Sequence, residues 1–419
     1  MENKEERKSA FSRRSVLKGG VAGLAAPLLG SAFVGRAQSQ EPINLGLVIA
    51  KSGVFAPQGQ SYADGAEVAL AQAGGKILGQ DARLIWYDEP SPQDAVQNFN
   101  KLAEQDKAIA VIGGSNSSTA LAMSAVAAEQ RLPLVTPGAS AREITGERCN
   151  PYTFRTIPTT QAFVEAIMPT LGGIGKNWYF LCATYAWGQD IYRTMKGKLD
   201  DAGGKELGND QVAGGTTDFS GYILKIRAAK PDLVVLGIAG ADIVNFLKQW
   251  AEMGMKDKIP VTCPTVSDVQ LWEVGPDAAT GIYGMPWYYK DSKNTAADQE
   301  FVQAIMDRTG APPPLTAWLS WKSTTLMIDA INAAGTRDPN EIVKALESIR
   351  QEDGGLPSYY RDFDHQLVRR CLVVKVKDKI EDGHDYLEPL GSVPESAEGF
   401  GSIYGTPETI ACKMPALAD

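Results

Sequence analysis

Two loops in the stretch from residue 108 to residue 145 carry the residue types best suited to hold a small ligand. The first loop contains Ser117, Ser118 and Thr119, and the second contains Gly138, Ala139 and Ser140. Each loop follows a short apolar run and leads into a helical segment, so hydroxyls and backbone N–H groups gather at a helix N-terminus. Such a place suits an anionic or polar group. The two loops therefore predict a binding site for a small molecule that carries a carboxylate.

Helix capping is the alternative explanation for these hydroxyls. A cap needs only one of the three hydroxyls in the first loop, so three in a row favour a binding role there. In the second loop, Ser140 and Glu143 have the spacing of a capping box, in which each side chain bonds to the other residue's backbone N–H. Capping and ligand binding both remain open for Ser140.

Strand and helix patterns alternate along the chain and would bring these loops to one edge of a sheet. Apolar runs at Ile43–Ala50, Ala82–Tyr87, Ala108–Ile112 and Leu134–Thr136 predict one parallel sheet, and runs at Asn177–Ala183, Gln211–Ala213, Pro231–Leu236 and Ile259–Cys263 predict another. Extended segments at Asn150–Pro158, Gly281–Tyr289 and Gly354–Asp364 predict three crossings between them. The predicted fold class is α/β, with two doubly wound Rossmann-like lobes, a three-strand hinge and a ligand cleft between the lobes.

The chain length agrees with two lobes, because a single hydrophobic core stops growing near about 250–300 residues and this chain has 419. Lobe 1 is predicted to comprise residues 41–155 and 286–362, and lobe 2 residues 156–285 and 363–419. The last 40 residues are polar and rich in Pro and Gly, which predicts a tail that wraps the surface.

The first 37 residues have the pattern of an export signal. Arg13 and Arg14 precede a Gly-, Ala- and Leu-rich segment, and cleavage is expected after Ala37, with Ser39 as the second choice. Removing the leader's seven basic and three acidic residues from a formal charge of −9 leaves −13. An acidic chain argues against a nucleic-acid partner, and no apolar run reaches the ~20 residues that a membrane span needs. We expect a periplasmic protein exported by the twin-arginine pathway.

Residues for catalysis or for a metal or cofactor are nearly missing. The two histidines, His365 and His384, lie in the last 60 residues, away from every predicted strand-end loop. The chain lacks phosphate-loop, nucleophile-elbow and zinc-protease motifs, so we expect no enzyme activity and no cofactor. Five scattered cysteines show no C-x-x-C pair: Cys149, Cys182, Cys263, Cys371 and Cys412. We expect Cys371 and Cys412 to form a disulfide that pins the tail, and at least one thiol to stay free.

Several short motifs, in their order and spacing, resemble the periplasmic branched-chain amino-acid-binding family, the type I solute receptors of ABC importers. They are Lys51-Ser52-Gly53, Ile112-Gly113-Gly114 followed by Ser118-Thr119, Thr136-Pro137-Gly138-Ala139-Ser140, Tyr152-Thr153-Phe154-Arg155-Thr156, Trp187-Gly188 and Asp218-Phe219-Ser220. The resemblance covers roughly residues 43–377. It implies a hinged two-lobe binding protein that captures a solute such as a branched-chain amino acid.

The resemblance also implies roles for particular residues. Ser118 and Ser140 would bind the ligand carboxylate, and the carbonyl of Gly138 would face an amino group. Trp187 would place an aromatic ring over the ligand from lobe 2, although packing between the lobes is an alternative for its indole. Contacts from the first loop of lobe 1 would come from Gln58 and Phe55.

One position departs from the family pattern. Family members that bind amino acids hold the ammonium with an acidic residue after the strand that is predicted here at Ile259–Cys263, and the matching position is Thr265. A buried ammonium without a carboxylate would be costly. Either Asp242 or Asp268 replaces the acid, or the ligand is an aromatic or aliphatic acid or a neutral amide.

The expected function is capture of a small carboxylate-bearing solute by hinge closure, followed by delivery to ABC permease subunits. The chain is expected to be a monomer. Two alternatives remain open: a sensor module of the same fold that reports the ligand to a partner, and a small-molecule hydrolase that uses Ser118.

Overall fold

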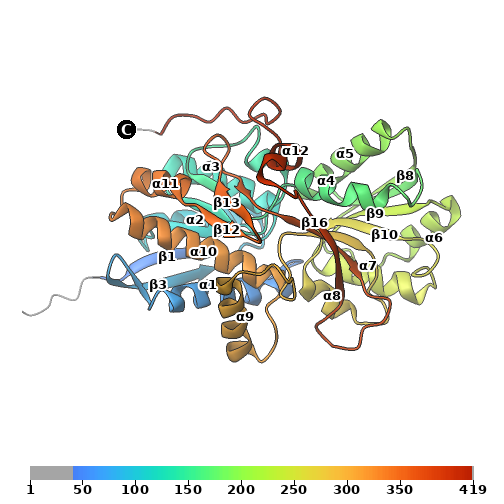
Figure 1. The fold of residues 1–419 in the computed structure, drawn as a ribbon, viewed down its shortest axis with the longest axis horizontal. Helices are drawn as coiled ribbons and strands as arrows, with labels where there is room; N and C mark the ends of the chain where they lie inside the picture. The colour runs from blue at the N-terminus through green and yellow to red at the C-terminus, as the bar shows by residue number, and fades with distance from the viewer. Residues whose placement is uncertain (1–40, 418–419) are drawn as a thin grey trace, which may run out of the picture. The chain divides into compact units, whose positions relative to one another are not determined.

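Two sheets organise residues 41–417, the part of the chain that the structure, a computed structural model, describes (Figure 1). The predicted export signal at residues 1–37 lies outside the described residues. No helix in the described part of the chain is long and apolar enough to cross a membrane. The α/β fold with two lobes is confirmed.

The first sheet has the strand order β2-β3-β1-β4-β5-β6. Its strands are β1 (Ile43–Val48), β2 (Lys76–Ile77), β3 (Gln80–Tyr87), β4 (Ala110–Gly113), β5 (Leu134–Thr136) and β6 (Thr153–Arg155). All neighbours pair in parallel except β2 and β3, which form a short antiparallel pair. The four residues of β4 are all buried, as expected for an apolar strand in the middle of a parallel sheet.

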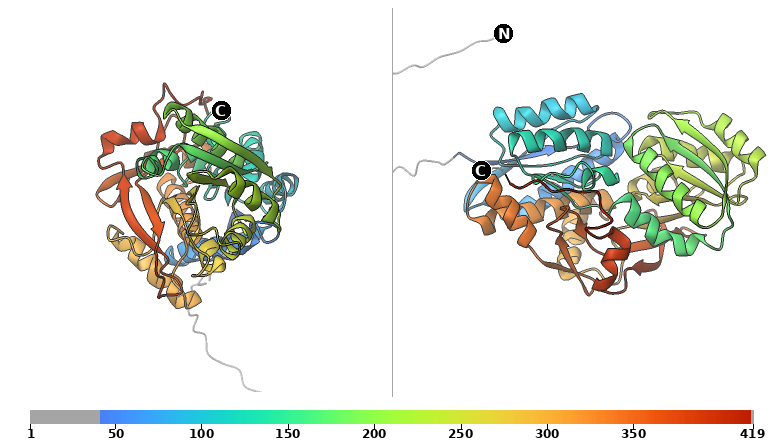
Figure 2. Two further views of the ribbon diagram at one scale, coloured as in Figure 1. Left: turned by 90° about the vertical axis from the view of Figure 1, so that its right-hand side faces the viewer. Right: turned by 90° about the horizontal axis from the view of Figure 1, so that it is seen from above.

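Helices from two distant parts of the chain belong to this first lobe. They are α1 (Ala56–Gln72), α2 (Pro92–Glu104) and α3 (Ser117–Gln130) from the early chain, and α9 (Ala296–Thr309), α10 (Leu315–Ala334) and α11 (Pro339–Ser348) from the late chain. Figure 2 shows the late helices, drawn in orange, beside the blue N-terminal strands. Close contact of α1 with α10 depends on Gly65, where a Cβ would lie 2.0 Å from the carbonyl oxygen of Ala317.

The second sheet has the order β16-β15-β11-β10-β9-β7-β8. Its strands are β7 (Asn177–Ala183), β8 (Lys205–Val212), β9 (Leu233–Gly237), β10 (Val261–Thr265), β11 (Ile282–Met285), β15 (Cys371–Val376) and β16 (Leu387–Val393). The helices of this second lobe are α4 (Thr160–Leu171), α5 (Ala186–Asp201), α6 (Ser220–Ala229), α7 (Ala241–Glu252), α8 (Asp268–Val274) and α12 (Phe400–Tyr404). Strands β7 to β11 pair in parallel, whereas β15 runs antiparallel to both β11 and β16. A third, small antiparallel sheet contains β12 (Gln351–Asp353), β13 (Leu356–Tyr360) and β14 (Leu367–Val368).

The chain passes between the two large sheets after β6, after β11 and between β14 and β15. Arg155, at the end of β6, joins two of these passages. Its backbone forms an isolated parallel bridge with Gln366, and its buried guanidinium donates from Nε to the Gln366 side chain at 2.6 Å. The predicted crossing strands are thus short sheet strands followed by brief connections. The exact residue boundaries of the lobes stay a prediction.

The structure corrects three expectations about secondary structure and cysteine pairing. The strand expected at Gln211–Ala213 is the end of the eight-residue β8, whose polar sequence suits an edge strand with one neighbour. The tail does not only wrap the surface, because β16 adds a strand to the second sheet.

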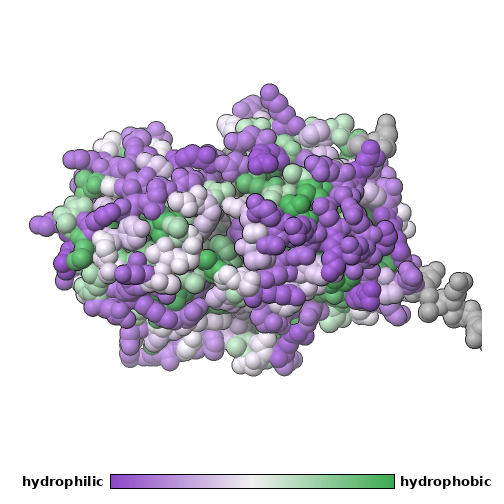
Figure 3. All heavy atoms as spheres, turned by 180° about the vertical axis from the view of Figure 1, so that it is seen from behind, coloured by the Kyte–Doolittle hydropathy of each residue, from purple (hydrophilic) through white to green (hydrophobic). Residues whose placement is uncertain are grey.

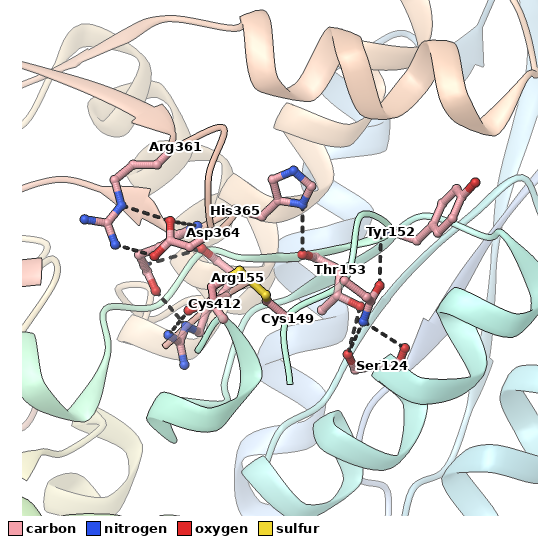
Figure 4. The surroundings of a disulfide bond; sticks show 12 residues. Ser124, Cys149, Tyr152, Thr153, Arg155, Arg361, Asp364, His365 and Cys412 are labelled. Atoms are coloured by element: carbon pink, nitrogen blue, oxygen red, sulfur yellow. Dashed lines mark hydrogen bonds and ion pairs between the residues drawn. A yellow bond between two sulfur atoms is a disulfide. The ribbon is translucent and has the colours of Figure 1, made fainter. Parts of the chain in front are cut away.

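The expected Cys371–Cys412 disulfide is wrong: Cys412 bonds to Cys149 (Figure 4), while the Cys371 thiol is buried on β15, 3.6 Å from the Tyr404 hydroxyl. The expected free thiol is confirmed, since Cys182, Cys263 and Cys371 are all unpaired and buried.

The face shown in Figure 3 is largely hydrophilic, with hydrophobic residues in small separate groups. Among the described residues, the large hydrophobic side chains that stay exposed are Leu224, Met306 and Leu390, from distant parts of the chain. Scattered single residues of this kind are ordinary on a protein surface and need no partner.

Replacing Gly65 by alanine should destabilise the protein, because the new methyl group would force α1 away from the backbone of α10. The expected loss is about 1–3 kcal/mol in the free energy of unfolding, as for other overpacked contacts. Urea unfolding followed by circular dichroism measures it. Gly197→Ala on α5 is the matched control, because a Cβ added there would have no atom within 4 Å beyond the nearby backbone of its own helix, and alanine favours a helix. Equal stability of the two variants would contradict the packing argument.

Candidate functional site

A cavity lies between the two lobes, at the carboxyl ends of their parallel strands. Lobe 1 contributes the start of α1, the loop between β4 and α3, the loop after β5 and the start of α10. Lobe 2 contributes the loops that follow β7, β9 and β10. The lining residues are Phe55, Gln58, Tyr62, Ser115, Asn116, Ser117, Gly138, Ser140, Ile157, Tyr185, Trp187, Ala239, Thr265, Val266, Ser267, Gln270, Leu315, Thr316 and Leu319.

Most of the residues that the sequence singled out line this cavity, and some lie behind it. The lining includes Phe55, Gln58, Ser117, Gly138, Ser140, Trp187 and Thr265. It does not include Ser118, Thr119, Ala139 or Asp242. Gln58 is in the first turn of α1. The roles of these residues in ligand binding stay predictions.

The first hydroxyl loop is organised by Asn116, which the sequence analysis did not single out. Its side chain caps α3 by accepting from the backbone N–H groups of Ser118 and Thr119 at 3.0 and 3.1 Å. The Ser117 hydroxyl accepts from the Ala141 N–H at 3.1 Å and so connects the two loops. The Ser118 hydroxyl faces the other lobe, where it accepts from the Ala186 N–H at 3.5 Å. Asparagine is among the preferred capping residues, so its type was the available clue.

Ser140 lies in the cavity wall without the capping bond that its sequence suggested. The short 3-10 helix η1 (Arg142–Ile144) follows Ala141 and has no side-chain cap, so the capping-box interpretation is wrong. The carbonyl of Ser140 accepts from the N–H of Thr160, at the start of α4, at 2.8 Å. This bond fixes the backbone of Ser140 and leaves its hydroxyl for another partner.

Five buried polar atoms in the cavity wall have no hydrogen-bond partner among the described residues. They are the hydroxyls of Ser140, Tyr185, Thr265 and Ser267 and the indole nitrogen of Trp187. Buried polar atoms in proteins nearly always have a partner. Their occurrence around one cavity indicates that these atoms can bond to a ligand held there.

Aromatic and aliphatic side chains form the rest of the wall. Phe55 and Tyr185, from opposite lobes, pack edge to face with their ring centroids 6.1 Å apart. Trp187 is in the first turn of α5 and only 7% exposed, so its indole is packed and does not stand free in a loop. Ile157, Val266, Leu315 and Leu319 complete the apolar surface. Such a wall suits an apolar ligand body, and a ring in particular.

Neither of the two acidic residues considered for an ammonium group lines the cavity. Asp242 is buried at the start of α7 and accepts from the Gly215 N–H at 3.0 Å. Asp268 is buried at the start of α8 and accepts from the Leu315 N–H, across the cleft, at 2.8 Å. Burial raises the pKa of Asp242 to about 6 and that of Asp268 to about 7. Both side chains hold backbone amides, and the lining residues that the structure describes include no Asp, Glu, Lys, Arg or His.

A buried glutamate that the sequence did not point to lies behind the cavity wall at Ser115. Glu89 is 2% exposed and accepts from the backbone N–H of Ser115 at 2.6 Å and also from its hydroxyl. Burial raises the pKa of Glu89 to about 8, although the bonds from Ser115 lower it. A neutral Glu89 would not repel a ligand carboxylate. Its place directly after β3, at the same edge as the other loops, was the clue in the sequence.

Neither histidine lies in the cavity lining. His365 is buried and stacks on Phe154 with ring centroids 3.8 Å apart, and its ring nitrogens face the Thr153 carbonyl and the Glu347 carboxylate. His384 packs against Trp272. The hydrolase alternative is therefore not supported, because its serine lacks a histidine partner in the part of the chain that the structure describes.

Comparisons with known proteins agree with this geometry. The sequence pattern of a family described as "Periplasmic binding protein" matches residues 42–383. The "Leu/Ile/Val-binding protein homolog 1" of Brucella abortus is 29% identical over 342 residues, which cover 80% of this chain and 88% of the relative. The solved structure of an amino acid ABC transporter substrate-binding protein from Pseudomonas fluorescens Pf-5 is similar with a TM-score of 0.79 and 25% identity, and the match covers 89% of this chain and 99% of that one. A solute-binding protein of an ABC transporter from R. palustris, solved in complex with benzoate, is similar with a TM-score of 0.77 and 23% identity. That match also covers 89% of this chain and 99% of the other.

Replacing Glu89 by glutamine should change how stability depends on pH. A carboxyl whose pKa is raised on folding stabilises the protein below its unfolded pKa of 4.5, and that contribution is lost as the pH rises toward 8. The free energy of unfolding of Glu89→Gln should therefore fall less steeply between pH 5 and 8, by up to about 1.4 kcal/mol per pH unit. Urea unfolding at a series of pH values measures this slope.

The neighbouring carboxylate supplies the control. Hydrogen bonds from Ser52 and from nearby backbone amides lower the pKa of Asp88 despite the opposing effect of burial, so Asp88 stays ionised across this range. Asp88→Asn should leave the slope between pH 5 and 8 unchanged. A slope that is the same in Glu89→Gln and in the unmodified protein would rule out the buried, protonated Glu89.

Proposed function

Since the chain belongs to the periplasmic binding protein family, whose members bind solutes and are not enzymes, we propose that it captures a small carboxylic acid that has no ammonium group. Aromatic acids are the preferred class. The lobes would close over the acid and deliver it to the permease of an ABC importer. The twin-arginine leader expected from the sequence supports export to the periplasm.

The observation that carries this proposal is the electrostatic character of the cavity. The helices that begin at its wall include α1, α3 and α5, whose N-cap residues Phe55, Asn116 and Tyr185 are in the lining. A helix N-terminus carries about half a positive charge, and each favours a nearby anion by about 0.3–1 kcal/mol. The same field opposes a cation. With no acidic side chain among the described lining residues, an ammonium group would lack the partner that its burial requires.

The polar and apolar parts of the wall fit the two ends of such an acid. Hydroxyls and backbone N–H groups gather on the lobe 1 side, around Ser115, Ser117 and Ser140. The rings of Phe55, Tyr185 and Trp187 would cover an apolar body. A carboxylate held without a cation needs several such donors, because each hydrogen bond to a charged group contributes only about 1.5–3 kcal/mol.

The relatives support both ligand classes, and the cavity favours one. The R. palustris structure holds benzoate, an acid without an amine, and the Pseudomonas fluorescens protein is described as an amino acid receptor. Thr265, where the family pattern expects an acid for the ammonium, favours the first class for this chain. The sensor alternative would share the same ligand site, and the presence of permease and ATPase genes beside this gene would favour transport.

Benzoate should bind at least about tenfold more tightly than benzamide, which has the same shape without the charge. Calorimetric titration of the mature protein measures both affinities. Ser140→Ala should weaken benzoate binding by about 1–3 kcal/mol, since a charged acceptor loses a donor, and should affect benzamide less. A thermal-shift screen of aromatic and aliphatic acids would first identify the best acid, because a ligand of the folded state raises the melting temperature.

Ser118→Ala is the matched comparison. The Ser118 hydroxyl lies outside the cavity lining, so this variant should retain benzoate affinity better than Ser140→Ala. A larger loss of benzoate affinity in Ser118→Ala than in Ser140→Ala would instead support the carboxylate-binding role that the family resemblance implies for Ser118. Benzamide and benzoate binding equally well would contradict the carboxylate site.

A further inference from the structure

An ion cluster joins the two lobes outside the ligand cavity. Asp190, on α5 of lobe 2, is fully buried and accepts from the backbone N–H and from Nε of Arg142, in η1 of lobe 1, at 2.9 and 2.8 Å. Arg193, nearly one turn further along α5, donates to Glu143 of the same 3-10 helix at 2.6 Å. Moving the lobes apart would break these bonds, so the cluster favours the arrangement in which they are close.

The C-terminal tail covers this cluster after leaving lobe 2. It starts from α12, whose Tyr404 is buried and donates its hydroxyl to the Arg369 carbonyl at 2.9 Å. The next carbonyl, of Gly405, accepts from Arg361 at 2.6 Å. Thr409, Ile410 and Ala411 then line a surface cavity together with Arg142, Glu143, Asp190 and Arg193. The tail thus lies across the line where the lobes meet.

The tail ends its passage on lobe 1, where it is held covalently. Cys412 forms a disulfide with Cys149, which lies between η1 and β6 and is 263 residues away in sequence. Figure 4 shows this disulfide beside Arg155, Arg361 and Asp364, residues of the passages between the sheets. Further on, Leu417 packs against the hydrophobic core of lobe 1. We call residues 405–412 the tail strap.

We propose that the tail strap limits how far the two lobes can separate. The strap is a covalent connection between the lobes in addition to the three passages of the main chain. The proposal rests on closure of the lobes, which is part of the proposed function, and it does not depend on the identity of the ligand.

The length of the strap decides how much opening it allows. Eight residues span at most about 28 Å when fully extended. The strap is not extended, because a turn at Thr406 is closed by hydrogen bonds from the N–H groups of Thr409 and Ile410 at 3.0 and 2.9 Å. Unwinding this turn would permit a limited opening for ligand entry, and the disulfide would prevent a wider one. A protein that spends more time near the closed arrangement binds its ligand more tightly.

Small-angle X-ray scattering of the mature protein without ligand tests the strap directly. Cys412→Ser removes the disulfide and should increase the radius of gyration, because the lobes can then open further. Cys149→Ser cuts the same bond and should give the same increase. Lys413→Ser is the matched control, since it changes an exposed neighbour in the tail and leaves the disulfide intact. An identical radius of gyration in all these variants and the unmodified protein would overturn the proposal.

Benzoate titration separates this proposal from the proposed function. If benzoate binds, Cys412→Ser should raise its dissociation constant about threefold or more and speed its release, while Lys413→Ser changes neither. If benzoate binds to none of the proteins, the acid-binding proposal loses support, and the scattering result still decides the strap. Should Cys412→Ser fail to fold, reduction of the folded protein replaces it, because the three remaining thiols are buried. Scattering that does not change on reduction would then overturn the strap.

Discussion

The convergence of helix N-termini on a cavity with an uncharged lining is the constraint on which the site depends. Helices α1, α3 and α5 come from both lobes, and all begin at this wall. Their partial positive charges act in a buried space where water screens them little. Two buried acidic residues, Glu89 and Asp268, hold backbone amides of lining residues, and burial raises the pKa of both. The proposed acid site thus has no cationic side chain among the described lining residues.

The same contacts that shape the cavity also connect the lobes. Asp268 of lobe 2 accepts from the first N–H of α10 in lobe 1, and Ser140 of lobe 1 accepts from the first N–H of α4. On the other side of the junction, the buried Asp190 holds Arg142. Each bond needs the lobes to be close together. Ligand contacts from both sides would add to this set, which is how binding and closure become linked.

The sequence predicted the strand and helix alternation well, because buried parallel strands are short apolar runs bounded by Gly and Pro. In the first hydroxyl loop, Ser117 lines the cavity and Ser118 does not, and the roles of both in ligand binding stay predictions. Adjacent helix residues point about 100° apart, so this choice depends on where α3 begins, and Asn116 sets that point through its cap. Two features could not be predicted: whether Asp242 lines the cavity, and which cysteine pairs with Cys412. Both depend on tertiary contacts, with 263 residues between the paired cysteines.

A matched pair of ligands tests the central claim, that this cavity accepts an acid and excludes an ammonium group. 4-Methylpentanoate has the carbon skeleton of L-leucine and lacks only its amine. Calorimetric titration of the mature protein with each should show that 4-methylpentanoate binds more tightly than L-leucine. Tighter binding of L-leucine would contradict the account, because it would require an ammonium partner that the described cavity wall does not contain.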